Sequence, residues 1–226
     1  MTNFKQFIEP NVGEDIKTIE QLNAWLQTQD LKMIRTIASR TALRSLPNLI
    51  AVSGQNLGMV PGWQLLLNSI RALLTVAVAS NCSEESVSQV EDIAEKLAHL
   101  PIMNVRIHAA FTSCAHAVHS AARSARTTFD CAQSTIETAT AAKDSFAERG
   151  EASLRAVFID AENGKSSQPL TLYHRNLWQG AQRADAANIG KTKKTEFETL
   201  ASNEPSWSFW RDWYQGFLDG KPLDWE

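Results

Sequence analysis

The stretch W-S-F-W-R-D-W-Y-Q-G-F-L-D-G, Trp207–Gly220, decides the fold class that the sequence predicts. On a helical wheel that advances about 100° per residue, its largest apolar side chains fall within an arc of about 140°. Pro205 precedes the stretch, Ser206 can cap a helix there, and Gly220 can end it. We therefore expect an amphipathic helix whose rings pack against the rest of the protein. The arc contains Trp207, Trp210, Trp213, Tyr214, Phe217 and Leu218.

The charges around these rings argue against a platform for stacking nucleic-acid bases. Such platforms place cations between their aromatic side chains. From Ala201 to Glu226 the chain instead has five acidic residues and two basic ones. Phosphates would be repelled, so the rings are expected to face the interior.

The last four residues have the composition of a helix start. Leu223-Asp224-Trp225-Glu226 offers a cap and a first turn, and the sequence then stops. We expect either that the chain is one part of a longer protein or that its tail docks on a partner, with Trp225 as a partner-binding residue. Residues 1–226 are expected to form a single helical domain, with 1–100 and 101–226 as potential sub-halves.

Cap and breaker residues predict helices along the first part of the chain. Thr18 begins a Thr-x-x-Gln capping box, and Asp30 can cap a second helix, which Pro47 is expected to end. Pro61 suits the first turn of a third helix that reaches about Ser80.

The middle of the chain, Ile102–Phe146, is dense in alanine, serine and threonine. Its apolar residues alternate at spacings of four and three, which is a seven-residue period and favours coiled-coil-like packing. The pattern fits one long helix or two helices that meet near Thr127-Thr128, where β-branched residues weaken a helix. Small side chains on this seam would allow another helix to approach closely.

Shorter elements are expected after the Ala-rich stretch. Glycines at Gly150 and Gly164 bracket a short helix, and Gln168-Pro169 is expected to open an irregular stretch. Further short helices are expected over Leu177–Ala187 and Lys193–Ala201. We find no convincing strand pair. The sequence therefore predicts an all-α protein, a multi-helix bundle around a long Ala-rich helix or helical hairpin.

Three stretches together resemble a set of uncharacterised bacterial all-helical proteins. They are I-A-S-R-T-A-L-R-S-L-P at Ile37–Pro47, the Ala-rich middle, and the W-x-x-W-x-x-W-Y pattern of Trp207–Tyr214 with Gly220. The resemblance implies a helical fold and a bacterial protein. It implies no activity, so no catalytic residue is carried over.

Composition limits the classes of protein that remain. The net charge of −3 gives no global attraction to nucleic acid. The three cysteines have wide, irregular spacing, which predicts reduced thiols in a cytoplasmic protein rather than disulfides or a zinc site. The N-terminus lacks a signal-peptide layout, and the most apolar run, Trp63–Ala79, contains polar and charged residues and is expected to be a core helix. We predict no membrane segment.

Two Gly-Lys-Ser/Thr ends look like phosphate loops, at Gly164–Ser166 and Gly190–Thr192. A phosphate loop also needs a glycine five residues before its second glycine. Those positions hold Ile159 and Asp185. We therefore expect no nucleotide site and interpret each glycine as a helix end followed by a solvated lysine.

Histidines and serines offer no clearer chemistry. His116 and His119 could share a metal, but Arg123 and Arg126 lie on the same helix face and would oppose a cation. No Gly-x-Ser-x-Gly elbow occurs. We accordingly predict no catalytic residue, no cofactor and no metal.

Basic residues gather where acidic ones are missing. Residues 31–83 contain no Asp or Glu but five Lys and Arg residues, and the Ala-rich helix has an acid-free face as well. The two could form a surface that binds anions or nucleic acid. Alternatively, the acidic stretch 84–95 lies against these cations inside the protein. The candidate anion-binding residues are Arg40, Arg44, His119, Arg123 and Arg126.

Three functions are consistent with these patterns. The first is a non-enzymatic helical protein-interaction or adaptor module, with a protein partner or a second copy of the chain as its ligand. The second is binding of nucleic acid or another polyanion through the basic helix faces. The third is an enzyme whose site cannot be recognised from sequence.

Overall fold

A computed structural model describes residues 15–50, 62–79, 128–145, 150–179 and 197–222, and every structural statement below concerns these residues. All regular elements within them are helices, so the predicted all-α class is confirmed. Residues 197–203 are also helical. The named helices are α1 (Ile19–Leu26), α2 (Leu31–Ile50), α3 (Gly62–Ala79), α6 (Thr128–Ser145), α7 (Gly150–Gly164), α8 (Pro169–Tyr173) and α10 (Trp207–Asp219).

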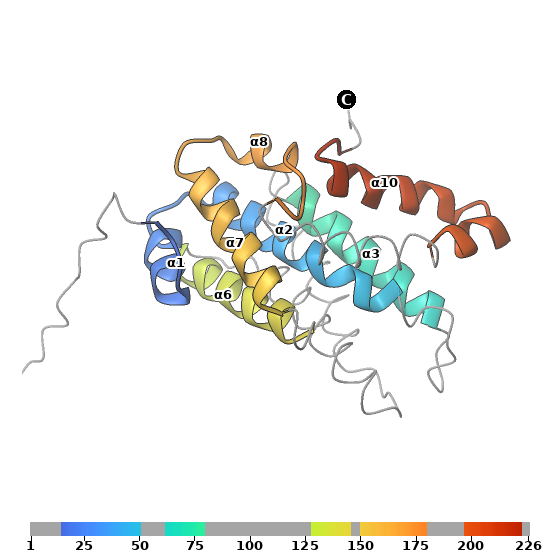
Figure 1. Cartoon of the computed structure of the whole chain (residues 1–226), viewed down its shortest axis with the longest axis horizontal. Helices are drawn as coiled ribbons and strands as arrows, with labels where there is room; N and C mark the ends of the chain where they lie inside the picture. The colour runs from blue at the N-terminus through green and yellow to red at the C-terminus, as the bar shows by residue number, and fades with distance from the viewer. Residues whose placement is uncertain (1–14, 51–61, 80–127, 146–149, 180–196, 223–226) are drawn as a thin grey trace, which may run out of the picture.

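Helix α2 lies at the centre of the bundle, where it contacts α3, α6, α7 and α8 (Figure 1). Helix α1 packs on α6 and α7 at one end. The expected central element was the Ala-rich helix, but its described part, α6, instead lies beside α2. Whether the Ala-rich stretch forms one helix or two is a question about residues 102–127, which lie outside the described ranges. No helix among the described residues has the length and apolarity needed to cross a bilayer.

The predicted caps of the first two helices are present. The Thr18 hydroxyl and the Gln21 side chain form the reciprocal capping box at the start of α1. The Asp30 carboxylate accepts a hydrogen bond from the backbone N–H of Met33 at 2.8 Å, which satisfies a donor at the start of α2.

The expectation that Pro47 ends the second helix is wrong, because α2 continues to Ile50 with Pro47 inside it. Proline removes one backbone hydrogen bond and disfavours a helix interior. Here the apolar residues on both sides, Leu46 and Ile50, are buried at 0% and 1% exposure. Their packing in the centre of the bundle outweighs the lost bond.

Small residues of α6 form the predicted seam. Ala132, Ala139 and Ala142 are fully buried. The hydroxyls of Thr135 and Thr138, also fully buried, each donate to the carbonyl oxygen four residues earlier, at 2.8 Å. These hydroxyls therefore need no partner on another helix, and α6 can approach α2 closely.

Helix α10 confirms the interpretation of the tryptophan-rich stretch. Trp207, Trp213, Tyr214 and Phe217 are buried. Gly220 adopts the left-handed conformation at φ 70°, which suits a residue without Cβ and ends the helix as predicted. Ser206 occupies the N-cap position as predicted, but its hydroxyl makes no capping hydrogen bond, because it donates to Glu204 at 3.2 Å instead.

The elements between α6 and α10 differ from expectation in two respects. Helix α7 spans the two glycines that were expected to bracket it. Pro169, however, begins the short helix α8, where the first helical position needs no N–H. Leu177 lies in a turn rather than at a helix start, and residues 180–196 lie outside the described ranges.

Candidate functional site

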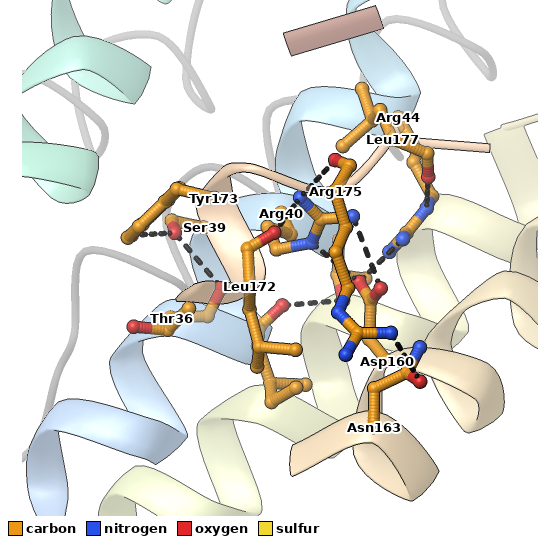
Figure 2. A network of polar contacts seen from close by, with 12 residues as sticks. Thr36, Ser39, Arg40, Arg44, Asp160, Asn163, Leu172, Tyr173, Arg175 and Leu177 are labelled. Carbon is orange, nitrogen blue, oxygen red and sulfur yellow. Dashed lines mark hydrogen bonds and ion pairs between the residues drawn. The ribbon is translucent and has the colours of Figure 1, made fainter. Parts of the chain in front are cut away.

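The most polar feature of the interior is a cluster of two arginines and one aspartate, which we call the buried ionic centre: Arg40, Arg44 and Asp160 (Figure 2). Arg40 and Arg44 have 0% exposure and Asp160 has 1%. Charged side chains are almost never fully buried unless they are paired.

The helices supply the geometry of this centre. Arg40 and Arg44 lie four residues apart on α2, so both project from one face of it. Asp160 reaches them from α7. The carboxylate accepts from Nε of Arg40 at 2.8 Å and from its Nη2 at 3.1 Å, and it also accepts from Nη2 of Arg44. One carboxylate thus serves two guanidinium groups.

The arginines also hold the chain that follows α8. Arg40 donates to the carbonyl oxygens of Leu172 at 2.6 Å, Arg175 at 3.0 Å and Asn176 at 3.1 Å. Arg44 donates from Nε to the carbonyl oxygen of Leu177 at 2.8 Å. Carbonyl groups at a helix end and in a turn lack helical partners and must be satisfied when buried. The two side chains perform that task here.

The same turn contacts the end of α10 on its other side. The backbone N–H of Leu177 donates to the carbonyl oxygen of Phe217 at 3.0 Å. A Cβ at Gly220 would lie only 2.7 Å from the backbone nitrogen of Asn176. The turn is therefore held between the arginines of α2 and the C-terminal end of α10.

Electrostatics set the protonation of the centre. Burial is the largest influence on Asp160 and opposes its ionisation, but the attraction and hydrogen bonds of Arg44 and Arg40 together outweigh it. The pKa of Asp160 therefore lies below its ordinary value of 3.8. Burial is also the largest influence on Arg44 and lowers its pKa, an effect that Asp160 opposes and Arg40 reinforces. Among the described residues, the two cations share one anion, so these three side chains together carry one surplus positive charge.

Further buried and half-buried polar groups extend the network around α8 (Figure 2). The hydroxyls of Ser39 and Tyr173 lie 2.6 Å apart, and Ser39 donates to the carbonyl oxygen of Thr36 at 3.0 Å. Arg175 donates to the side chain of Asn163 at 2.7 Å. These bonds fasten α8 to both α2 and α7.

Comparisons with protein-family models, with curated proteins and with solved structures find no match to this chain. What the chain does is therefore inferred from its own residues and their geometry.

The structure corrects the expected position of two candidate anion-binding residues. Arg40 and Arg44 do not lie on an exposed basic face of α2, because the core encloses both side chains. Their acidic partner is Asp160 of α7, a residue that the sequence analysis did not name. The other named candidates, His119, Arg123, Arg126 and Trp225, lie outside the described residues.

A signal for Asp160 exists in the sequence. Val157 and Ala161 are fully buried on the same helix, and Asp160 lies among them as the acidic residue of an apolar face. A carboxylate in that position needs a buried cation. Two arginines spaced by four residues on α2 lie on one face of that helix and are candidates for that partner.

A surface cavity of about 440 Å³ lies between the segment before α1 and helix α7. Its acidic side chains are already paired: Asp15 with Lys17 at 2.8 Å, and Glu162 with Lys165 at 2.9 Å. Glu151 pairs with Lys143 at 2.6 Å. The cavity thus offers no surplus of negative charge for a cation, and no three potential metal ligands cluster in the described part of the chain.

A row of aromatic rings connects the interior with the surface of α10. Phe209 is 45% exposed and packs edge-on against Trp210, with ring centroids 5.0 Å apart. Trp210 packs on Trp213 at 6.1 Å, Trp213 on Phe217 at 5.2 Å, and Phe217 on Tyr173 at 6.0 Å. The exposed ring of Phe209 therefore packs on the half-buried ring of Trp210, which in turn packs on buried rings.

Proposed function

We propose that this chain is a helical protein-interaction module whose contact surface is the outer edge of α10. The observation that carries the proposal is the exposure of Phe209 beside the half-buried Trp210. Large apolar side chains that are exposed and rigid are typical of the residues that dominate the energy of protein interfaces.

The row of rings explains why this edge would bind without a large entropic cost. Trp210 is held between Phe209 and Trp213, and Trp213 has 0% exposure. A ring that is already fixed by packing loses little conformational freedom when a partner covers it. The edge of α10 is therefore suited to act as a preformed anchor.

Charge around the edge favours a basic partner. Residues 198–222 contain four acidic and two basic side chains. The side chain of Asp212, three residues after Phe209 and therefore beside it on the helix, is 59% exposed. We propose a partner helix with an apolar stripe flanked by lysine or arginine, because such a helix would match both the rings and the carboxylates.

The experiment begins with photo-crosslinking. A photoreactive amino acid in place of Phe209 should capture the partner in cells that produce the full chain, and mass spectrometry should identify the segment that is attached. The affinity of the purified partner for the unmodified chain is then measured by calorimetry. Phe209→Ala is expected to weaken binding about tenfold or more, as for a central interface residue.

Leu170 provides a matched control, since it is 56% exposed but lies on α8. Leu170→Ala should leave the affinity unchanged. Equal affinities for the wild type and both variants, or a captured segment without basic residues, would contradict the proposal. Circular dichroism of each variant separates loss of binding from loss of fold.

A further inference from the structure

The two arginines of the buried ionic centre use their hydrogen-bond donors very unequally. A guanidinium group has five N–H donors. Arg40 makes five hydrogen bonds, to Asp160 and to three backbone carbonyl oxygens. Arg44 makes only two, to Leu177 and Asp160, and its buried Nη1 has no hydrogen-bond partner in the described part of the chain. Among the described residues, Arg40 therefore has a hydrogen-bond acceptor for each of its nitrogen atoms, whereas Nη1 of Arg44 has none.

The charges of the buried ionic centre also point to a missing negative group beside Arg44. Arg40 and Arg44 are both fully buried, and Asp160 is the carboxylate that pairs with them. An uncompensated charge in the interior is strongly unfavourable. Unlike an aspartate or lysine, an arginine does not escape the cost by losing its charge in the ordinary pH range. Among the described residues, Nη1 of Arg44 thus has no hydrogen-bond acceptor, and the two arginines have one carboxylate between them.

Helix α10 contributes one further polar side chain to the interior, Tyr214. Tyr214 has 4% exposure and is one of the groups that act to raise the pKa of Arg44, which indicates that the two side chains lie near each other. A phenolic hydroxyl near a guanidinium can donate a hydrogen bond to any negative group that binds there.

We infer that a small anion, for which chloride is the probe, binds inside the bundle against Nη1 of Arg44, with the Tyr214 hydroxyl as a second donor. The anion would supply the second negative charge that two buried arginines require, and it would accept the hydrogen bonds that Asp160 and Leu177 leave unmade. This site differs from the proposed edge of α10 in both its residues and its ligand.

The test is the thermal stability of the full chain in sodium chloride compared with sodium gluconate at equal ionic strength, because gluconate is too large to enter a buried site. A ligand that binds only the folded state raises Tm with its concentration. At one hundred times the dissociation constant, the rise expected for a chain of this size is about 5–10 °C. No difference between the two salts would overturn the inference.

Two variants test whether the stabilisation by chloride depends on Arg44. Arg44→Met leaves Arg40 and Asp160 as a neutral pair, so the Tm of this variant should not depend on chloride. Arg211→Met removes a cation from the surface of α10 and should retain the full dependence. Equal chloride dependence in the wild type and Arg44→Met would show that chloride acts elsewhere.

Tyr214→Phe keeps the ring and removes only the hydroxyl, and it should shift the chloride midpoint to higher concentration. If Arg44→Met does not fold, crystals of the wild type grown in bromide decide the question by anomalous scattering. A bromide peak beside Nη1 of Arg44 would support the site, and a map without one there would refute it.

Discussion

Arg40 of α2 and Asp160 of α7 meet side-on, with Nε donating to Oδ2 at 2.8 Å and Nη2 to Oδ1 at 3.1 Å. The two residues are 120 positions apart in the sequence. This arrangement is the bidentate form in which an arginine and a carboxylate interact most strongly. It fixes the orientation of α7 on the central helix, and it directs the remaining donors of Arg40 towards the turn after α8.

Removing the carboxylate should destabilise the protein severely. Asp160→Asn keeps the size of the side chain but removes the carboxylate that pairs with two buried guanidinium groups. We expect the free energy of unfolding to fall by about 3–5 kcal/mol, the cost typical of breaking a buried ion pair on one side. Urea denaturation measures this change. Asp212→Asn, which breaks an exposed pair with Arg211, is the control and should change stability little.

The same carboxylate predicts a dependence of stability on acid. The pKa of Asp160 is lower in the folded protein than its ordinary value of 3.8, so the unfolded state binds the proton first as pH falls. The stabilisation is fully present above about pH 5 and is lost progressively as pH falls below the unfolded value of about 3.9. The stability difference between wild type and Asp160→Asn should therefore shrink below pH 4. A difference that stays constant from pH 7 to pH 3 would contradict this assignment.

Gly220 should tolerate no side chain. Its φ of 70° costs an L-residue about 1–2 kcal/mol, and a Cβ would also meet the Asn176 backbone nitrogen at 2.7 Å. Gly220→Ala is expected to lower Tm on both grounds. Gly220→Asn relieves only the first, since asparagine accepts the left-handed region, and it should remain less stable than the wild type. A Gly220→Asn variant with the wild-type Tm would show that the Asn176 backbone does not restrict a side chain at this position.

Rings of α10 should differ sharply in their contribution to stability. Trp213 is fully buried, so Trp213→Ala is expected to cost about 3–5 kcal/mol. Phe209 is 45% exposed, and Phe209→Ala should cost less than about 1 kcal/mol. Chemical denaturation of the two variants compares them. Similar losses would mean that Phe209 serves the fold rather than a partner.

The helical class and α10 were predictable because they depend on local periodicity. Buried rings recur at the helical repeat in Trp207–Gly220, and Gly220 marks the end of the helix. The caps at Thr18 and Asp30 are also local, since each acts within three residues. The prediction that Pro47 ends the helix was wrong because it considered backbone chemistry alone. Packing of α2 against several neighbouring helices keeps it helical beyond Pro47.

The buried ionic centre was not predictable in the same way. A central helix has no solvent-facing stripe to show which polar residues are enclosed, so Arg40 and Arg44 were assigned to a surface. Their partner on α7 lies more than one hundred residues further along the chain. Only the three-dimensional packing of α2 on α7 brings these charges together.

The peptide group of Leu177 is shared by two parts of the molecule: its oxygen accepts from Arg44, and its nitrogen donates to Phe217. Detachment of α10 would break the second bond and expose one side of the turn that the arginines hold. The C-terminal helix should therefore belong to the same cooperative folding unit as the central helix. In native-state hydrogen exchange, the amide of Leu177 should be released by large-scale opening and not by fraying at the chain end.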